Sequence, residues 1–179
     1  DLGDHLLWGS GAGLGTYVHA YGAAYISRII EPNGDRTEFV RDGVSLKSIE
    51  KYDNANTRLK AVKLQRDGQR RISAIYPPDR LDANGNPAGP AAVTYDYDEA
   101  GNLAAVGKLV AGGDPTAPVY ATTRYSYTHP RFPHLLTRIT DPRGIVTLEV
   151  EFDDRGRIVG TVDAFGNRTP TIENAAALP

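Results

Sequence analysis

The chain has 179 residues, a formal net charge of −2, 23% charged residues, no Cys and no Met. This near-neutral balance excludes a general electrostatic attraction to nucleic acid or to an anionic membrane, and no apolar run approaches the ~20 residues of a transmembrane helix. The lack of Cys excludes disulfides, thiol nucleophiles and Cys-based metal sites, and the lack of Met leads us to expect a piece of a longer polypeptide.

Residues 1–24 form a Gly-rich opening segment, in which glycines occupy every second position from Gly9 to Gly15. This spacing does not match the glycine patterns of dinucleotide-binding or phosphate-binding loops, and no Lys-Ser or Lys-Thr pair follows it. We therefore expect a flexible or closely packed strand here, with Trp8 anchored on a neighbouring surface.

From Tyr25 onward, apolar and polar residues alternate in short runs, and turn sequences such as Glu31-Pro32-Asn33-Gly34 separate the runs. A period of two predicts strands, and turns with Pro, Asn and Gly between them predict hairpins. Residues 77–90 form the longest turn-rich connection, either a protruding loop or a tight reversal at Asn84-Gly85. The expected strands are residues 25–30, 36–40, 44–50, 59–65, 71–76, 91–98, 103–110, 119–127, 145–152 and 157–162.

The clearest strand is 145–152, where apolar side chains alternate from Val146 to Phe152 while Thr147, Glu149 and Glu151 take the positions between them. Such alternation predicts one buried face and one face in water. No window has a helical period. The prediction is an all-β fold in which residues 25–169 form an array of antiparallel β-hairpins in a curved or spiral sheet, followed by an irregular tail at 170–179.

The turns are predicted to depend on aspartate and glycine. An aspartate at the start of a turn accepts backbone N–H bonds, and a glycine near its end adopts the positive φ that the reversal requires. The residues expected to have this structural role are Asp98, Gly101, Asp141, Pro142, Gly144, Asp153, Gly156, Asp163 and Gly166.

These turns carry a family resemblance. The segments at 95–103 (Tyr-Asp-Tyr-Asp-x-x-Gly-Asn-Leu) and 152–158 (Phe-Asp-x-x-Gly-Arg-Ile) resemble YD repeats. The segments at 140–144 and 161–167 resemble the linking turns of the RHS (rearrangement hotspot) family. Asn56, Phe152 and Ala164 depart from the family's Gly, Tyr and Pro, and each substitution still permits the turn.

The resemblance implies a β-shell that encloses a C-terminal, toxin-like segment of a secreted or cell-surface bacterial protein. Its partners would be the remaining repeats of the same polypeptide and the enclosed segment, and it would be a structural protein and not an enzyme. No cofactor is implied. No metal site is expected, because His5, His19, His129 and His134 lack the spacing of metal ligands.

Two alternative functions remain open. RHS-type shells end in paired Asp-Pro-x-Gly turns whose aspartates resemble an aspartyl protease dyad, and here eighteen residues separate the turns that begin at Asp141 and Asp163. The same spacing is the ordinary repeat period, which favours turn formation. The second alternative is a carbohydrate- or partner-binding module, with Tyr95, Tyr97, Tyr125 and Tyr127 as sugar-stacking rings; their alternation on one face favours packing in the core instead.

Overall fold

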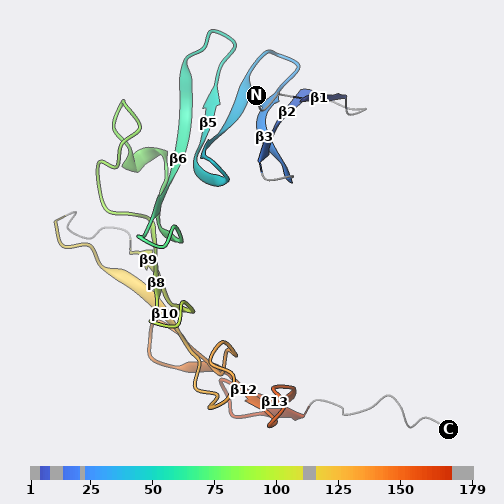
Figure 1. Ribbon diagram of the computed structural model, residues 1–179. Coiled ribbons are helices and arrows are strands. Elements are labelled where there is room, and N and C mark those ends of the chain that lie inside the picture. The colour runs from blue at the N-terminus through green and yellow to red at the C-terminus, as the bar shows by residue number, and fades with distance from the viewer. Residues whose placement is uncertain (1–4, 9–13, 21–22, 111–115, 171–179) are drawn as a thin grey trace. The chain divides into compact units, whose positions relative to one another are not determined.

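The computed structural model describes residues 5–8, 14–20, 23–110 and 116–170, and it divides into an N-terminal unit, residues 1–92, and a C-terminal unit, residues 93–179. Within each unit every described strand pairs with the next one along the chain, always antiparallel. The predicted all-β, antiparallel hairpin architecture is therefore confirmed (Figure 1).

The N-terminal unit begins its strands before Tyr25, since two paired strands lie within the segment that the sequence set apart as Gly-rich. Gly9, Gly11 and Gly13 themselves fall outside the described residues. The strands are β1 (His5–Trp8), β2 (Leu14–Ala20), β3 (Ala23–Ile30), β4 (Arg36–Asp42), β5 (Ser45–Tyr52), β6 (Arg58–Arg66) and β7 (Ile72–Tyr76).

The C-terminal unit repeats the same meander. The strands predicted at 91–98, 103–110, 119–127, 145–152 and 157–162 are found within a few residues of those bounds, whereas the sequence did not predict the two short strands at 138–140 and 168–170. The predicted tail covers residues 170–179, of which residues 171–179 fall outside the described part. The strands are β8 (Val93–Tyr97), β9 (Leu103–Leu109), β10 (Tyr120–Ser126), β11 (Arg138–Thr140), β12 (Val146–Phe152), β13 (Ile158–Asp163) and β14 (Arg168–Pro170).

The long connection after β7 folds back onto β6, and its single 3₁₀ turn, η1 (Pro78–Arg80), contacts that strand (Figure 1). The Arg58 guanidinium donates to the carbonyls of Ala83 and Asn84, and Lys63 Nζ donates to the Gly85 carbonyl at 3.2 Å. Two cations on β6 thus hold the connection at its tip. No helix in the described residues is long and apolar enough to cross a membrane.

The paired strands of the N-terminal unit place a row of apolar side chains across one face. The register aligns Phe39, Ile49 and Val62 across β4, β5 and β6. On the opposite face Glu38 and Glu50 lie opposite each other. Side chains two residues apart share a face, and the alternate positions along these strands are mostly polar, namely Thr37, Lys47, Lys51 and Lys60, so the apolar row runs across the strands and not along them.

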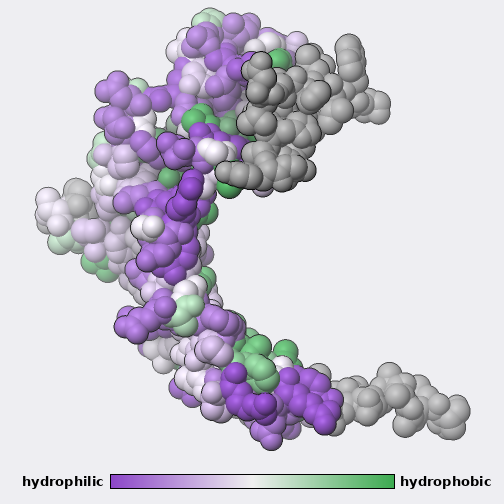
Figure 2. All heavy atoms as spheres, in the orientation of Figure 1, coloured by the Kyte–Doolittle hydropathy of each residue, from purple (hydrophilic) through white to green (hydrophobic). Residues whose placement is uncertain are grey.

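The C-terminal unit is divided in the same way. Tyr125, Ile139 and Leu148 align across β10, β11 and β12 on one face, while Arg138 and Glu149 align on the other. Figure 2 shows hydrophobic residues gathered on the surface beside β12 and β13.

The predicted buried face is only half-buried. Among the side chains that the structure describes, those classed as buried are small, namely Ala61, Ala74, Ala91 and Ser48, and no large side chain is fully buried. The reason is that, apart from the connection over β6 and the segment 127–137 beside β12, no second layer in the described residues packs against either sheet. Over most of its described residues each unit is therefore a single layer with an apolar row across one face.

Candidate functional site

The recurring turn is the most regular feature of the structure, and Asp153 shows its construction. The backbone N–H of Asp153 donates to the Arg157 carbonyl, and the Gly156 N–H donates to the Asp153 carbonyl, both at 2.9 Å. The Asp153 side chain then accepts the N–H groups of Arg155 and Arg157 through Oδ1, each at 2.9 Å, and the Arg157 Nε through Oδ2 at 2.7 Å. Both carboxylate oxygens are thus used within the turn.

The same arrangement recurs in both units. In each case the aspartate N–H bonds to the carbonyl four residues on, and the N–H three residues on bonds back to the aspartate carbonyl. This is a type I turn closed by a residue of positive φ, the usual three-residue hairpin loop. Its aspartates are Asp53, Asp67, Asp82, Asp98, Asp141, Asp153 and Asp163.

Asp141 and Asp163, the candidate dyad, both have this geometry. The backbone N–H of Ile145 and the side chain of Arg143 hold the pKa of Asp141 below its usual range. The side-chain amide and backbone N–H of Asn167 do the same for the pKa of Asp163. Both groups are therefore held ionised by donors of their own turns, whereas a protease dyad requires two carboxyl groups that share a proton.

β12 lies between the two turns. Asp141 closes its turn against Ile145, just before β12, while Asp163 lies opposite Leu148 on the other side of that strand. The hydrogen bonds of both described carboxylates run to their own turns and not to each other.

The tyrosine row is distributed over β8 and β10. Tyr95 lies opposite Val106, and Val106 lies opposite Thr123, so Tyr95 and Tyr125 share the apolar face. Tyr97 lies opposite Leu103 at the end of β8. The Tyr127 hydroxyl donates to the Leu103 carbonyl at 3.0 Å, and burial raises the pKa of Tyr127. All four rings are half-buried in the single layer.

The segment between β10 and β11 ties neighbouring turns together. His129 Nδ1 accepts the backbone N–H groups of Arg131 and Phe132, at 3.2 and 3.1 Å. Because Nδ1 accepts, the proton resides on Nε2, which faces the Asp153 carbonyl at 3.4 Å. Arg131 donates to the Asp154 carbonyl at 3.0 Å, so this segment is fixed to the turn after β12.

On its other side the segment reaches the turn after β8. The Asn102 side-chain amide donates to the Pro133 carbonyl at 2.9 Å, and His134 Nδ1 lies 2.6 Å from Asn102 Oδ1. Asn102 also donates to Asp98 Oδ2 at 2.9 Å. The segment 127–137 therefore bridges two turns that are not adjacent in the sequence.

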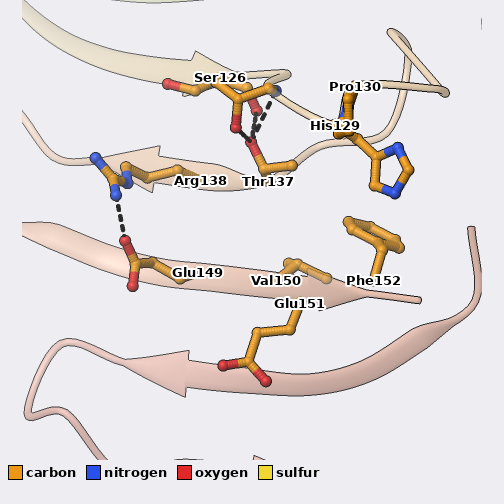
Figure 3. A pocket seen from close by; sticks show the side chains of 10 residues that line it. Ser126, His129, Pro130, Thr137, Arg138, Glu149, Val150, Glu151 and Phe152 are labelled. Atoms are coloured by element: carbon orange, nitrogen blue, oxygen red, sulfur yellow. Dashed lines mark hydrogen bonds and ion pairs between the residues drawn. The ribbon is translucent and has the colours of Figure 1, made fainter. Parts of the chain in front are cut away.

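Beside this segment lies a groove of about 400 Å³ (Figure 3). The rings of His129 and Phe152 stand edge to face at one end, with centroids 6.0 Å apart, and the ion pair between Arg138 and Glu149, 2.5 Å long, lies at the other. Its lining combines aromatic rings with charged side chains from adjacent strands.

Sequence reasoning considered His129 and His134 only as metal ligands and did not find this groove. Among the described residues no group of three His, Asp or Glu side chains is placed to hold a metal ion. The sequence signal for this segment is the His-Pro-x-Phe run at 129–132. It interrupts the alternation of the strands and places an imidazole acceptor next to backbone N–H groups that no strand pairs. The side chains of His5 and His19 fall outside the described ones.

No protein-family model matches the sequence, and no curated protein does. Among solved structures, the chain is similar to one in the Tc holotoxin pore of Photorhabdus luminescens with a mutant TccC3, at 12% identity and a TM-score of 0.45, covering 97% of this chain and 11% of that one. It is also similar to a chain of TcdB2-TccC3 without its hypervariable C-terminal region, at 13% identity and a TM-score of 0.44, covering 98% and 11%. The chain thus spans about a tenth of the length of these proteins.

Proposed function

We propose that this chain is a structural segment of a repeat protein, adding hairpins to a β-sheet whose apolar face covers a cargo polypeptide. The observation that carries the proposal is the half-buried apolar row on each unit, such as Tyr125, Ile139 and Leu148, over which the described residues place no second layer. Apolar surface of this kind is stabilised when a partner removes it from water.

The recurring turn supports the same proposal. A single hairpin is marginally stable, and a sheet made of repeats is stabilised by each neighbour that it gains. Because each of the seven recurring turns is closed by its own aspartate, hairpins of this kind can be added without any change in the turn. The resemblance of residues 95–103 and 152–158 to YD repeats suggests the setting, a secreted or cell-surface bacterial shell around a C-terminal, toxin-like cargo.

The proposed role is not enzymatic. The donors around Asp141 and Asp163 suit turn formation, and this favours the structural role over self-cleavage. We expect mass spectrometry of the longer polypeptide to show the same cleavage products, or the same lack of them, in the wild type and in the variant that combines Asp141→Asn with Asp163→Asn. Loss of a cleavage product in that variant would instead establish the aspartates as a protease pair.

The test of encapsulation uses two neighbouring residues of β12. Leu148 lies on the apolar face opposite Ile139, while its exposed neighbour Thr147 has no opposite residue on β11. In the longer polypeptide that contains this chain, we expect Leu148→Asp to make the segment that follows the repeats sensitive to protease, while Thr147→Asp leaves it protected. Circular dichroism confirms that both variants fold. Equal protection in both would contradict a role of this face in covering cargo.

A second candidate is a glycan-binding module. The groove beside β12 offers the Phe152 ring at one end and the charged side chains of Arg138 and Glu149 at the other, a combination suited to the rings and hydroxyls of a glycan. Glycan-array binding that is lost in Phe152→Ala or Tyr125→Ala, with folding retained, would favour this function. Absence of binding by the folded wild-type chain would remove it.

A further inference from the structure

One end of the N-terminal unit carries a second groove, of about 230 Å³, between the turn that joins β4 to β5 and the turn that joins β6 to β7. Leu64 contributes the apolar part of its lining. The remaining lining residues are polar or charged: Asp42, Ser45, Lys47, Arg66 and Arg70.

The cations of this groove are short of carboxylates. Arg66 donates to two carbonyls, those of Arg70 at 2.7 Å and Leu46 at 3.0 Å, and its buried Nε has no partner in the structure. Arg70 donates to the Asp42 carbonyl at 3.4 Å. Carbonyl oxygens satisfy donors but do not neutralise charge, so both guanidinium groups keep their positive charge uncompensated.

The single carboxylate in the lining is a weak counterion. Asp42 Oδ2 lies 3.6 Å from Lys47 Nζ, and its side chain is 65% exposed. Several other cations of the unit have carboxylate partners, since Arg28 and Arg36 both contact Glu38 and Lys51 contacts Glu31. Arg58 and Lys63, like Arg66 and Arg70, bond to neutral oxygens instead. With Lys47, Arg66 and Arg70 against Asp42 alone, the groove has an excess of positive charge.

Arg70 also has an unusual backbone conformation. Its φ is +66°, the left-handed region, which a residue with a Cβ adopts only at a cost. The equivalent position in the other described turns is Gly, or Asn56 in one of them. The turn has a glycine available at Gly68, two residues earlier, yet the positive φ falls on Arg70. A strained arginine at a position that glycine fills elsewhere indicates selection for its side chain.

We propose that this groove binds a tetrahedral oxyanion, the sulfate or phosphate group of an ester. The ammonium of Lys47 and the guanidinium groups of Arg66 and Arg70 would supply charge-assisted donors, and the Ser45 hydroxyl a neutral one. The volume admits one such group with a small substituent. This site is independent of the proposed cargo-covering function, which rests on the apolar face.

Binding is tested by titrating the folded chain with inorganic phosphate and inorganic sulfate at low, constant ionic strength, with chloride as the reference. We expect saturable shifts of the backbone amide resonances of residues 42–47 and 66–70. A response that grows linearly, or that chloride reproduces, would overturn the proposal. A sulfated disaccharide and glycerol phosphate, compared at equal concentration, then distinguish a sugar from a lipid headgroup as the natural source.

Three variants are expected to change phosphate affinity in different directions. Arg70→Gly removes the charge and the strained φ together, so we expect about tenfold weaker phosphate binding with a higher unfolding temperature. Asp42→Asn removes the competing carboxylate, so we expect tighter binding. Lys60→Gln, which removes an exposed cation of β6 that is not in the lining, should leave affinity unchanged.

The result for each variant can contradict the proposal independently of the others. If Arg70→Gly binds phosphate as well as the wild type does, or if Lys60→Gln weakens binding to the same extent, the groove is not the site. Lys47→Gln provides a second charge deletion at an exposed position, where folding is not at risk, and it should weaken binding in the same direction as Arg70→Gly.

Discussion

At the scale of single residues, two glycines occupy the same place in successive turns but have different surroundings. Gly144 has a φ of +83° and open space where a Cβ would lie, whereas Gly156, at +76°, would place a Cβ 3.0 Å from a ring carbon of Phe132. We expect Gly144→Ala to cost about 1 kcal/mol of unfolding free energy, from the positive φ alone. Gly156→Ala should cost more in urea unfolding, because the Phe132 ring must also move. Equal losses of unfolding free energy in the two variants would show that the Phe132 ring can move away at no cost.

The turn aspartates make stability depend on acid pH. The pKa of Asp141, Asp153 and Asp163 is lowered by hydrogen bonds that form only in the folded turn. Since the folded pKa lies below the unfolded value of about 3.9, the stabilisation is complete above that value and is lost as pH falls through the folded pKa. We expect the unfolding temperature to be constant above about pH 5 and to fall at lower pH.

The control for this pH dependence is Asp153→Asn. An Asn oxygen still accepts the backbone N–H groups of Arg155 and Arg157 but does not titrate, so this variant should lose less stability on acidification than the wild type. An acid-induced fall of the same size in both proteins would mean that Asp153 does not contribute to it.

At the scale of elements, the segment 127–137 depends on the ring of His129 as a cap for two backbone N–H groups. We expect His129→Asn to keep slow hydrogen exchange at the amides of Arg131 and Phe132, because the Asn side-chain oxygen can accept in place of Nδ1. His129→Ala should expose both amides to exchange. If the two variants exchange alike, ring packing against Phe132 and Phe152, and not the cap, holds the segment.

Most of the strands could be predicted from the sequence because alternation and turn residues are local signals. For the same reason the turn at Asp153-Asp154-Arg155-Gly156 could be located from its own four residues. The three-residue strands β11 and β14, by contrast, are too short to show alternation. The bridge from His129 to Asp153, and the groove beside it, depend on residues that are far apart in the sequence and meet only when β10, β11 and β12 pair. Similarly, the predicted strands 59–65 and 71–76 imply a turn between them, yet local chemistry gave no reason to place its positive φ on Arg70.

At the scale of the whole molecule, the absence of a second layer in most of the described chain determines how stability is distributed. Within each unit the described strands contact the strands that precede and follow them, and a further contact joins β6 to η1. In a globular core the effect of losing one contact is spread over several layers, whereas here each strand depends on its immediate neighbours. Energetics of this kind are those of repeat proteins, in which stability is a sum of units and nearest-neighbour terms.

Reciprocal substitutions test this locality. Gly34 closes the turn between β3 and β4 at a φ of +89°, and a Cβ there would lie 3.1 Å from that of Asn54. We expect Gly34→Ala to speed hydrogen exchange in β3, β4 and β5 and to leave β11, β12 and β13 unchanged, while Gly156→Ala does the reverse, because each perturbation decays across neighbouring strands. A uniform increase in every strand for both variants would instead mean that the chain unfolds as one cooperative body, in which nearest-neighbour energetics do not apply.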